Sequence, residues 1–371
     1  LAQASGRPVR IIRSREESIL THVKRHPVII RYRSGITRDG KLTAVHAEAI
    51  GDTGPYVNAG RDVMNFVAAT LSGPYYVPNA RLESYTGFTN NPICGAMRGY
   101  GIPQASFAYE AQMDALARAI GMDPLEIRLC NGLETGMQAP TGVTIREGRG
   151  MKICLQEAAT LSGWSERNKE NRQPAPHLRR GWGMASIWFS IGKGRNIPDN
   201  AGATLEMIQD GSVILHTGAA DMGQGTHTVL AQMAAEALGV KLEAVRVVGP
   251  DTERTFDAGP SVASRQTFIS GNAVLRAAQP IRETLLQTAS EETGFPMEKL
   301  QLREGLLFAE DELLSQTVAE LAAKAAQRNR RLHADGFYAM EYPEALPPNG
   351  YPFAPAVFTF GTQVAQVLVD I

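Results

Sequence analysis

Residues 95–104 read Gly95-Ala96-Met97-Arg98-Gly99-Tyr100-Gly101-Ile102-Pro103-Gln104, and a helical pattern of apolar residues follows them directly. Three glycines thus surround one arginine and one aromatic ring. Glycine lets the main chain approach a ligand closely, and proline is favoured in the first turn of a helix. We therefore predict a loop whose backbone N–H groups face an oxo group or a phosphate at a helix start. The alternative is a tight turn in which Arg98 pairs with a carboxylate on the surface.

Two further polar loops precede helical patterns in the same way. The second reads Asp221-Met222-Gly223-Gln224-Gly225-Thr226-His227, and the third reads Gly259-Pro260-Ser261-Val262-Ala263-Ser264-Arg265-Gln266-Thr267. A glycine loop between a strand and a helix N-terminus is typical of a phosphate site. The amides, hydroxyls and guanidinium of these loops suit a polar ring and a pyrophosphate. The alternatives are a plain turn with a helix cap at the second loop, a surface charge at Arg265, and helix N-caps at Ser264 and Thr267.

The composition is that of a globular chain with little net charge. It has 371 residues, 43% of them hydrophobic and 20% charged, and a formal net charge of −1. Such a length predicts two lobes, because a single core usually stops growing before this size. The charge balance argues against a nucleic-acid surface, and no apolar run approaches the roughly 20 residues of a membrane span. Three scattered cysteines, Cys94, Cys130 and Cys154, form no disulfide framework or iron-sulfur motif and favour a reducing, cytoplasmic compartment.

Local patterns predict helices and strands in irregular alternation. Asp39-Gly40 and Asp210-Gly211 each lie between strand-like runs and predict hairpins. Asp123-Pro124 predicts the N-cap and first residue of a helix. Further helices are predicted by apolar periodicity over residues 104–120, 151–162, 226–238, 270–288 and 317–326. Without a regular strand–helix–strand repeat, the pattern favours an α+β fold. The polar segment 166–180 is the expected connector between lobes of residues 1–165 and 181–371.

In this order and spacing, the three loops resemble those of the molybdenum-binding subunit of the xanthine dehydrogenase/aldehyde oxidase family, the molybdenum hydroxylases. The resemblance runs through nearly the whole chain. It implies a two-lobed molybdopterin-binding architecture with mixed sheets and helices. The implied activity is oxidation of purines, other N-heterocycles or aldehydes with water as the oxygen source. The implied cofactor is molybdenum-molybdopterin in its cytosine dinucleotide form, with 2Fe-2S and FAD centres on other domains or subunits of an oligomeric assembly.

The resemblance also implies roles for single residues. Arg98 and Ala263 are expected beside the molybdenum, and Tyr100 against the substrate. The organic cofactor is expected to bind to Met97, Arg98, Met222, Gly223, Gln224, Gly225, Ser264, Arg265, Gln266 and Thr267. Trp188 and Phe189 are expected either in the substrate pocket or in the core of a sheet.

Some features of the family are missing from this chain. A glycine-rich loop is expected before Leu1. The glutamate that serves as general base is expected beyond Ile371, because Glu110, Glu126, Glu157 and Glu206 lie in ordinary helical or strand patterns. We therefore expect a piece of a longer protein that is inactive when isolated. Where purine-oxidising members place a substrate-anchoring arginine, the gapless match gives Phe66, which weakens a strict xanthine assignment.

Other interpretations remain open. The chain is alternatively a non-catalytic fragment or paralogue that serves as a scaffold or subunit-interaction module without cofactor. A nucleotide-binding oxidoreductase is disfavoured, because neither loop has Gly-x-Gly-x-x-Gly with an acidic residue about 20 residues on. His227 is expected to form hydrogen bonds at a helix start. His22 and His26 are four residues apart, but Pro27 ends any helix there, which argues against a zinc site.

Overall fold

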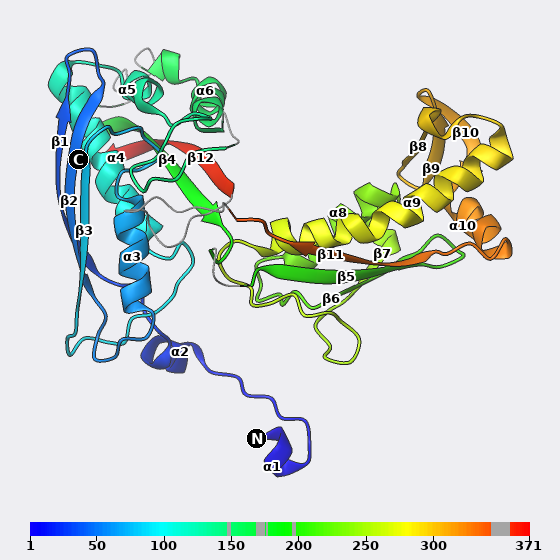
Figure 1. Ribbon diagram of the computed structural model, residues 1–371. Helices are drawn as coiled ribbons and strands as arrows, with labels where there is room; N and C mark the ends of the chain where they lie inside the picture. Colours follow the sequence, from blue (N-terminus) through cyan, green and yellow to red (C-terminus); the bar gives the residue numbers. More distant parts are fainter. Residues whose placement is uncertain (147–149, 168–174, 176, 195–197, 343–356) are drawn as a thin grey trace. The chain divides into compact units, whose positions relative to one another are not determined.

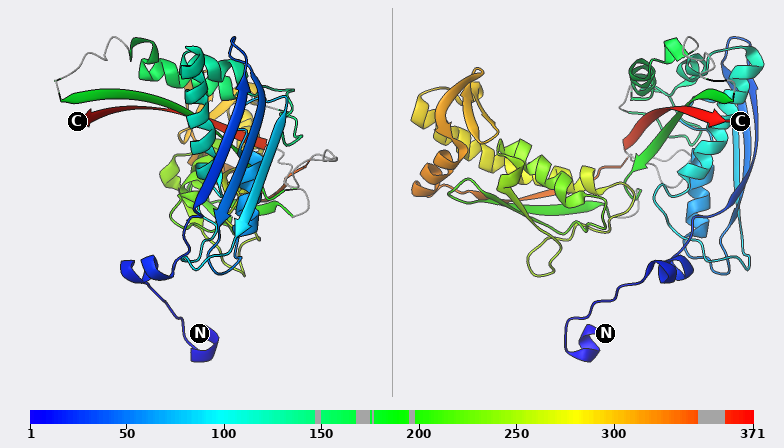
Figure 2. Two further views of the ribbon diagram at one scale, coloured as in Figure 1. Left: turned by 90° about the vertical axis from the view of Figure 1, so that its left-hand side faces the viewer. Right: turned by 180° about the vertical axis from the view of Figure 1, so that it is seen from behind.

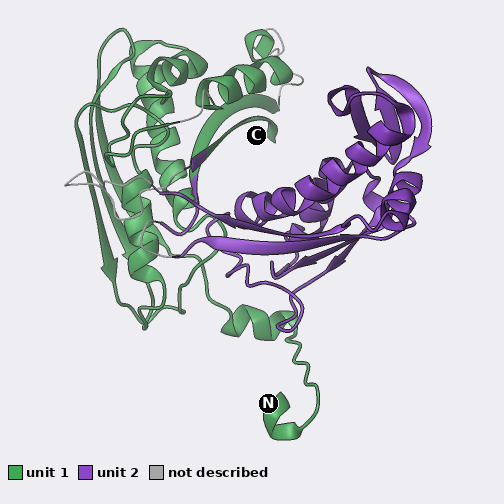
Figure 3. Cartoon of the chain, turned by 45° about the vertical axis from the view of Figure 1, so that its right-hand side comes forward, with its two compact units in different colours: residues 1–189, 359–371 green, residues 190–358 purple. Residues whose placement is uncertain are grey.

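The chain forms two compact units of mixed helices and strands. The computed structural model describes all residues except 147–149, 168–174, 176, 195–197 and 343–356 (Figure 1). Unit 1 comprises residues 1–189 and 359–371, and unit 2 comprises residues 190–358 (Figure 3). The α+β prediction is confirmed. The units change over at 189/190, after the segment 166–180, part of which lies outside the described residues. The lobe boundary within that segment stays a prediction.

Unit 1 contains a three-stranded sheet of order β1-β2-β3 (Figure 2). Strands β1 (Val28–Ile36) and β2 (Leu42–Asp52) are antiparallel, and β3 (Ala80–Gly87) runs parallel to β2. The predicted hairpin at Asp39-Gly40 is confirmed, with Gly40 at φ 86°. Side chains alternate along β2, so that Val45, Ala47 and Ala49 are buried on one face.

Helices supply the rest of the unit 1 core. Helices α3 (Gly60–Thr70) and α4 (Ile102–Ile120) contribute Met64 and Met113 to the cluster that includes the buried face of β2. Helix α5 (Pro124–Asn131) begins as predicted, because the Asp123 carboxylate accepts the Leu125 N–H at 2.8 Å. The remaining elements are α1 (Ala2–Ser5), α2 (Arg15–Thr21), α6 (Gly150–Ser162), the short η1 (Trp164–Glu166), and β4 (Leu178–Ile191), which pairs with β12 (Val357–Asp370).

Unit 2 is built on a four-stranded sheet of order β11-β5-β6-β7. Strands β11 (His333–Ala339), β5 (Asn200–Met207) and β6 (Val213–Thr217) are antiparallel neighbours, and β7 (Val245–Val248) runs parallel to β6. Helices α8 (Thr226–Leu238) and α9 (Gly271–Thr293) pack on this sheet (Figure 1). At Gly336 a Cβ atom would lie 2.1 Å from the Ala273 carbonyl oxygen, so glycine is required where α9 crosses β11.

The end of α9 leads into a small second sheet. Strands β8 (Leu300–Arg303), β9 (Leu306–Ala309) and β10 (Glu312–Thr317) are antiparallel, and α10 (Val318–Gln327) follows them. Short turns η2 (Leu242–Ala244), η4 (Met297–Lys299) and the π-helical η3 (Gln266–Ser270) complete the unit. The predicted helices at 226–238, 270–288 and 317–326 are thus present within a few residues. Among the described residues no helix has the length and apolar character needed to cross a membrane.

A buried ionic cluster ties the helices of unit 1 together. The Arg128 side chain is fully buried, and its Nε donates to Glu110 Oε2 at 2.7 Å. Its Nη2 donates to Asp114 Oδ1 at 2.8 Å, and Tyr75 Oη donates to Glu110 Oε1 at 2.6 Å. Burial raises the pKa of Glu110, and the neighbouring guanidinium opposes that rise. Helices α4 and α5 are therefore joined through charges that have no access to water.

We expect Arg128→Met to lower the free energy of unfolding by about 3–5 kcal/mol, because Glu110 would stay buried without its cation. Urea denaturation of the intact protein measures this loss. The matched control is Arg31→Met, since Arg31 is exposed and its pair with Glu48 should contribute less than about 1 kcal/mol. Equal effects of the two variants would show that the buried pair does not hold the helices together.

Candidate functional site

The first loop ends in three successive residues with left-handed backbone. Gly99 has φ 94°, Tyr100 has φ 45°, and Gly101, the N-cap of α4, has φ 100°. A tyrosine in this conformation is uncommon and costs free energy, which is typical of functional loops. The Arg98 side chain is exposed and forms no ion pair with a carboxylate among the described residues, so the alternative of a surface pair is not observed. Met97 is also exposed.

Tyr100 belongs to an aromatic cluster in unit 1. Its ring meets Phe66 of α3 edge to face, with the ring centroids 5.9 Å apart, and Phe66 lies 5.7 Å from the ring of Phe189 on β4. Burial raises the pKa of the Tyr100 phenol. Trp188, the next residue along the strand, is only 2% exposed and lies in the core. The structure thus brings Tyr100 and Phe189 together through Phe66, and it places Trp188 apart from their exposed side.

The second loop is held by its own side chains. Asp221 Oδ1 accepts the Gly223 N–H at 2.8 Å, and Oδ2 accepts the His227 N–H at 3.1 Å. These hydrogen bonds lower the pKa of Asp221. The Gln224 amide accepts from Met222 N at 2.5 Å and donates to Ala220 O at 3.0 Å. The first turn of α8 therefore already has an anionic partner, and the Met222 side chain is left exposed. His227 hydrogen-bonds the Ala219 carbonyl oxygen, as expected for a helix-start residue.

The third loop contacts the second and turns sharply at two residues with L side chains. Ser261 Oγ donates to the Ala220 carbonyl oxygen at 2.6 Å, which joins the two loops. Ala263 and Ser264 have φ 53° and 52°. The π-helix that follows is also a feature found at functional sites. It begins without a side-chain cap, so the N-cap alternative for Ser264 and Thr267 is wrong, and both side chains are exposed.

Arg265 is fully buried, and the alternative of a surface charge is wrong. Its Nε donates to Asp199 Oδ1 at 2.5 Å and its Nη2 to the Asn200 carbonyl oxygen at 2.7 Å. Its Nη1 donates to the carbonyl oxygens of Ala258 and Pro260. The guanidinium thus holds the loop from beneath. Gln266 is likewise buried and bonded to Ser270, so the side chains that face outward here are Ser264 and Thr267.

Asp199 and Tyr342 are residues of this site that the sequence did not indicate. The Asp199 carboxylate accepts the Lys193 N–H at 2.8 Å and the Tyr342 hydroxyl at 2.7 Å, in addition to Arg265. Burial and this carboxylate raise the pKa of Tyr342. Asp199 stands 66 positions before Arg265 in the chain, and no local motif marks either partner. Only the folded chain brings them together.

The described residues contain no group of three or more His, Cys, Asp or Glu side chains that could hold a metal ion. His22 is the C-cap of α2 and His26 lies beyond that helix, so the two do not share a helical face. A metal at these loops would bring its own ligands, as a pterin cofactor does. Exposed hydroxyls and left-handed main chain at the third loop fit such an organic group. The loops of unit 2 and that of unit 1 each present donors of this kind.

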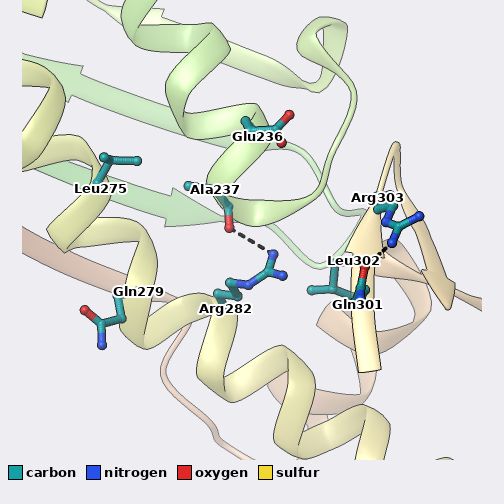
Figure 4. A pocket seen from close by; sticks show the side chains of 8 residues that line it. All are labelled: Glu236, Ala237, Leu275, Gln279, Arg282, Gln301, Leu302 and Arg303. Carbon is teal, nitrogen blue, oxygen red and sulfur yellow. Dashed lines mark hydrogen bonds between the residues drawn. The ribbon is translucent and has the colours of Figure 1, made fainter. Parts of the chain in front are cut away.

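A polar hollow of about 420 Å³ lies at the other end of α8, lined by that helix, α9 and β8 (Figure 4). Arg282 donates to the Ala237 carbonyl oxygen at 3.2 Å, and Arg303 is bonded to Gln301 and Asp311. The second loop adjoins the N-terminal end of α8 instead. The hollow is therefore separate from the loops, and its guanidinium groups already have partners.

Comparison with known families decides the relationship. A model described as the molybdopterin cofactor-binding domain matches residues 157–371, and a second with the same description matches residues 1–132. The chain belongs to the molybdenum hydroxylase family. Both matches include predicted loops, the first loop in residues 1–132 and the other two in residues 157–371.

Relatives within the molybdenum hydroxylases agree. The chain is 36% identical over 292 residues to the xanthine dehydrogenase molybdenum-binding subunit of Escherichia coli O157:H7, covering 78% of this chain and 39% of the relative. It is 31% identical over 374 residues to a probable xanthine dehydrogenase of Bacillus subtilis (strain 168), covering 100% and 48%. The crystal structure of quinoline 2-oxidoreductase from Pseudomonas putida 86 superposes with a TM-score of 0.75 at 26% identity, covering 100% and 48%. The chain thus spans less than half the length of these relatives.

We expect Asp199→Asn to destabilise unit 2 by about 3–5 kcal/mol, because the Arg265 guanidinium would stay buried without an anion. Hydrogen–deuterium exchange should also accelerate in residues 258–267. The control is Asp335→Asn, whose carboxylate accepts the Thr204 hydroxyl on an exposed face of the sheet. Unchanged exchange in residues 258–267 of Asp199→Asn would contradict the anchoring role of the pair.

Proposed function

We propose that this chain forms the molybdopterin-binding part of a hydroxylase that oxidises an N-heterocycle, a purine or an aldehyde with water as the oxygen source. The observation that carries the proposal is the first loop, where three left-handed residues stand beside the cluster of Tyr100, Phe66 and Phe189. Backbone strain of this kind persists where a functional site requires it. The relatives called xanthine dehydrogenase and quinoline 2-oxidoreductase support the reaction class.

The three loops would hold the cofactor, in its cytosine dinucleotide form, mainly by main chain and hydroxyl groups. Arg98, Ser264 and Thr267 have exposed side chains that donate to oxo and phosphate oxygens. Ala263 would leave room beside the metal, since its side chain is a single methyl group. Gln224, Arg265 and Gln266 would act by shaping their loops, because their amides and guanidinium already bind protein groups. When bound, the metal lowers the pKa of a coordinated water so that it can attack an electron-poor carbon.

The aromatic cluster would receive the flat ring of the substrate. Aromatic rings bind one another by offset stacking and by edge-to-face contacts. Phe66 carries no charge, so the cluster favours an uncharged heterocycle or aromatic aldehyde over an anionic purine. The raised pKa of Tyr100 keeps its hydroxyl protonated, and this hydroxyl can donate a hydrogen bond to a polar ring atom.

The general base and the electron acceptors are proposed to lie on other parts of the assembly. The buried Glu110 is bonded to Arg128 and Tyr75 and has no access to a substrate. We propose 2Fe-2S and FAD partners on further domains or subunits of an oligomer. We also propose a cytoplasmic location, because the three cysteines are free and one of them, Cys130, is exposed.

A scaffold module without cofactor is the second candidate. It is favoured by the internal bonding of Gln224 and Arg265 and by the Asp221 carboxylate at the start of α8. Metal and pterin analysis of the intact purified protein separates the two functions. Molybdenum and pterin in near-equal amounts to the protein support the hydroxylase, and their absence supports the scaffold.

We expect Gln224→Ala to lower the pterin content of the intact protein by about 10-fold, because the amide that shapes the second loop is lost. Pterin is measured by fluorescence after oxidative release. Gln232→Ala, on an exposed position of α8, is the control and should keep its pterin. Full pterin content in Gln224→Ala would remove this residue from the site.

We expect Tyr100→Ala to lower kcat/KM by about 10-fold or more while molybdenum content stays unchanged, because stacking and packing against the substrate are lost. Tyr85→Ala, at an exposed position of β3, should change neither quantity. A parallel loss of metal and activity in Tyr100→Ala would instead indicate a structural role.

A further inference from the structure

The dipeptide Arg25-His26 lies beneath the first loop and is bound to both of its ends. The segment before it runs alongside the loop, with Lys24 N donating to Ile93 O and Gly95 N donating to Lys24 O, each at 3.0 Å. A Cβ atom on Gly95 would lie 2.9 Å from Val23 Cβ, so this close contact requires glycine. Neither the sequence motifs nor the aromatic cluster involves this dipeptide.

Arg25 binds the main chain of the loop at its centre. Its Nη2 donates to the Arg98 carbonyl oxygen at 2.7 Å, across 73 positions of sequence. Among the described residues Arg25 forms no ion pair with a carboxylate, so this carbonyl is the acceptor that fixes its guanidinium. A charged donor makes a stronger hydrogen bond than a neutral one.

His26 binds the far end of the loop. The Gln104 amide, in the first turn of α4, donates to the His26 carbonyl oxygen at 3.1 Å. The His26 ring is 2% exposed, and its Nε2 has no hydrogen-bond partner among the described residues. Burial lowers the pKa of this ring, so it is packed in its neutral form. The left-handed residues 99–101 are thus clamped between Arg25 on one side and His26 on the other.

The bond to the Arg98 carbonyl also fixes the direction of the next N–H. In a planar trans peptide the C=O and the following N–H point in opposite directions. The Gly99 N–H therefore points away from Arg25, and it has no acceptor among the described residues. A hydrogen bond accepted by the carbonyl polarises the peptide and strengthens this donor.

We propose that Arg25 is a positioning residue that aims the Gly99 N–H at an oxygen ligand of the metal. The inference rests on the proposed function, because it takes the first loop as part of the cofactor site. Arg25 touches neither substrate nor cofactor itself. It acts through the peptide between Arg98 and Gly99, and its loss would leave that peptide free to rotate.

The test compares Arg25→Met and Arg25→Lys with Arg33→Met in the intact enzyme with its partners. Arg33 is exposed on β1 and serves as the matched control. Pterin content, kcat, KM and the Mo(V) electron paramagnetic resonance signal are measured for each. We expect Arg25→Met to lower kcat about 10-fold or more at unchanged KM and pterin content, and to shift the Mo(V) signal. Arg25→Lys, which keeps a charged donor, should recover part of both, and Arg33→Met should match the unaltered enzyme.

If Arg25→Met does not fold, Arg25→Gln replaces it, because its shorter amide cannot reach the carbonyl, and the same shifts are expected. A normal kcat and Mo(V) signal in a fully loaded variant overturns the inference. So does a loss of activity that only follows a loss of pterin, since Arg25 would then be a structural residue. An unaltered enzyme without molybdenum or pterin contradicts the proposed function itself, which distinguishes the two failures.

Discussion

The buried ion pair between Arg265 and Asp199 determines the shape of the third loop, and the second loop depends on the third. A guanidinium and a carboxylate without access to water are stable only when their remaining donors and acceptors are also bonded. Here the carbonyl oxygens of Asn200, Ala258 and Pro260 and the hydroxyl of Tyr342 complete the set. The main chain is therefore held where Ala263 and Ser264 adopt left-handed conformations, and Ser261 passes this constraint on to Ala220.

Unit 1 uses arginine in the same manner. Arg128 binds carboxylates and a carbonyl in the core, and Arg25 binds the carbonyl of Arg98 under the first loop. The five donors of a guanidinium suit main-chain carbonyls as well as phosphate oxygens. An arginine next to a glycine-rich loop can thus support the loop as well as contact its ligand. Arg98 and Arg265, equally prominent in sequence, separate on this ground, since one is exposed and the other is buried.

Local structure can be predicted where a short pattern determines it. The two Asp-Gly turns, the Asp123 cap and the helix over residues 226–238 depend on neighbouring residues, and all are present. Helix α3 carries no such signal, because it begins at Ala59 without a side-chain cap. The sequence therefore does not indicate Phe66 as a partner of Tyr100 and Phe189, three residues that are far apart in the chain. Asp199, Tyr342 and Arg25 are hidden for the same reason, since each acts through contacts more than 60 residues away.

The pairing of β4 with β12 has a consequence for biosynthesis. Unit 2 is inserted between these two strands, so the ribosome makes all of residues 190–358 after β4 and before its partner. Domains tend to fold as units while the chain emerges, starting from the N-terminal side. The first three strands of unit 1 can assemble early, but β4 keeps an unpaired edge until the inserted unit has been completed. Such an edge is open to wrong partners in the meantime. Rapid folding of the insertion is therefore what shortens the exposure of the nascent chain.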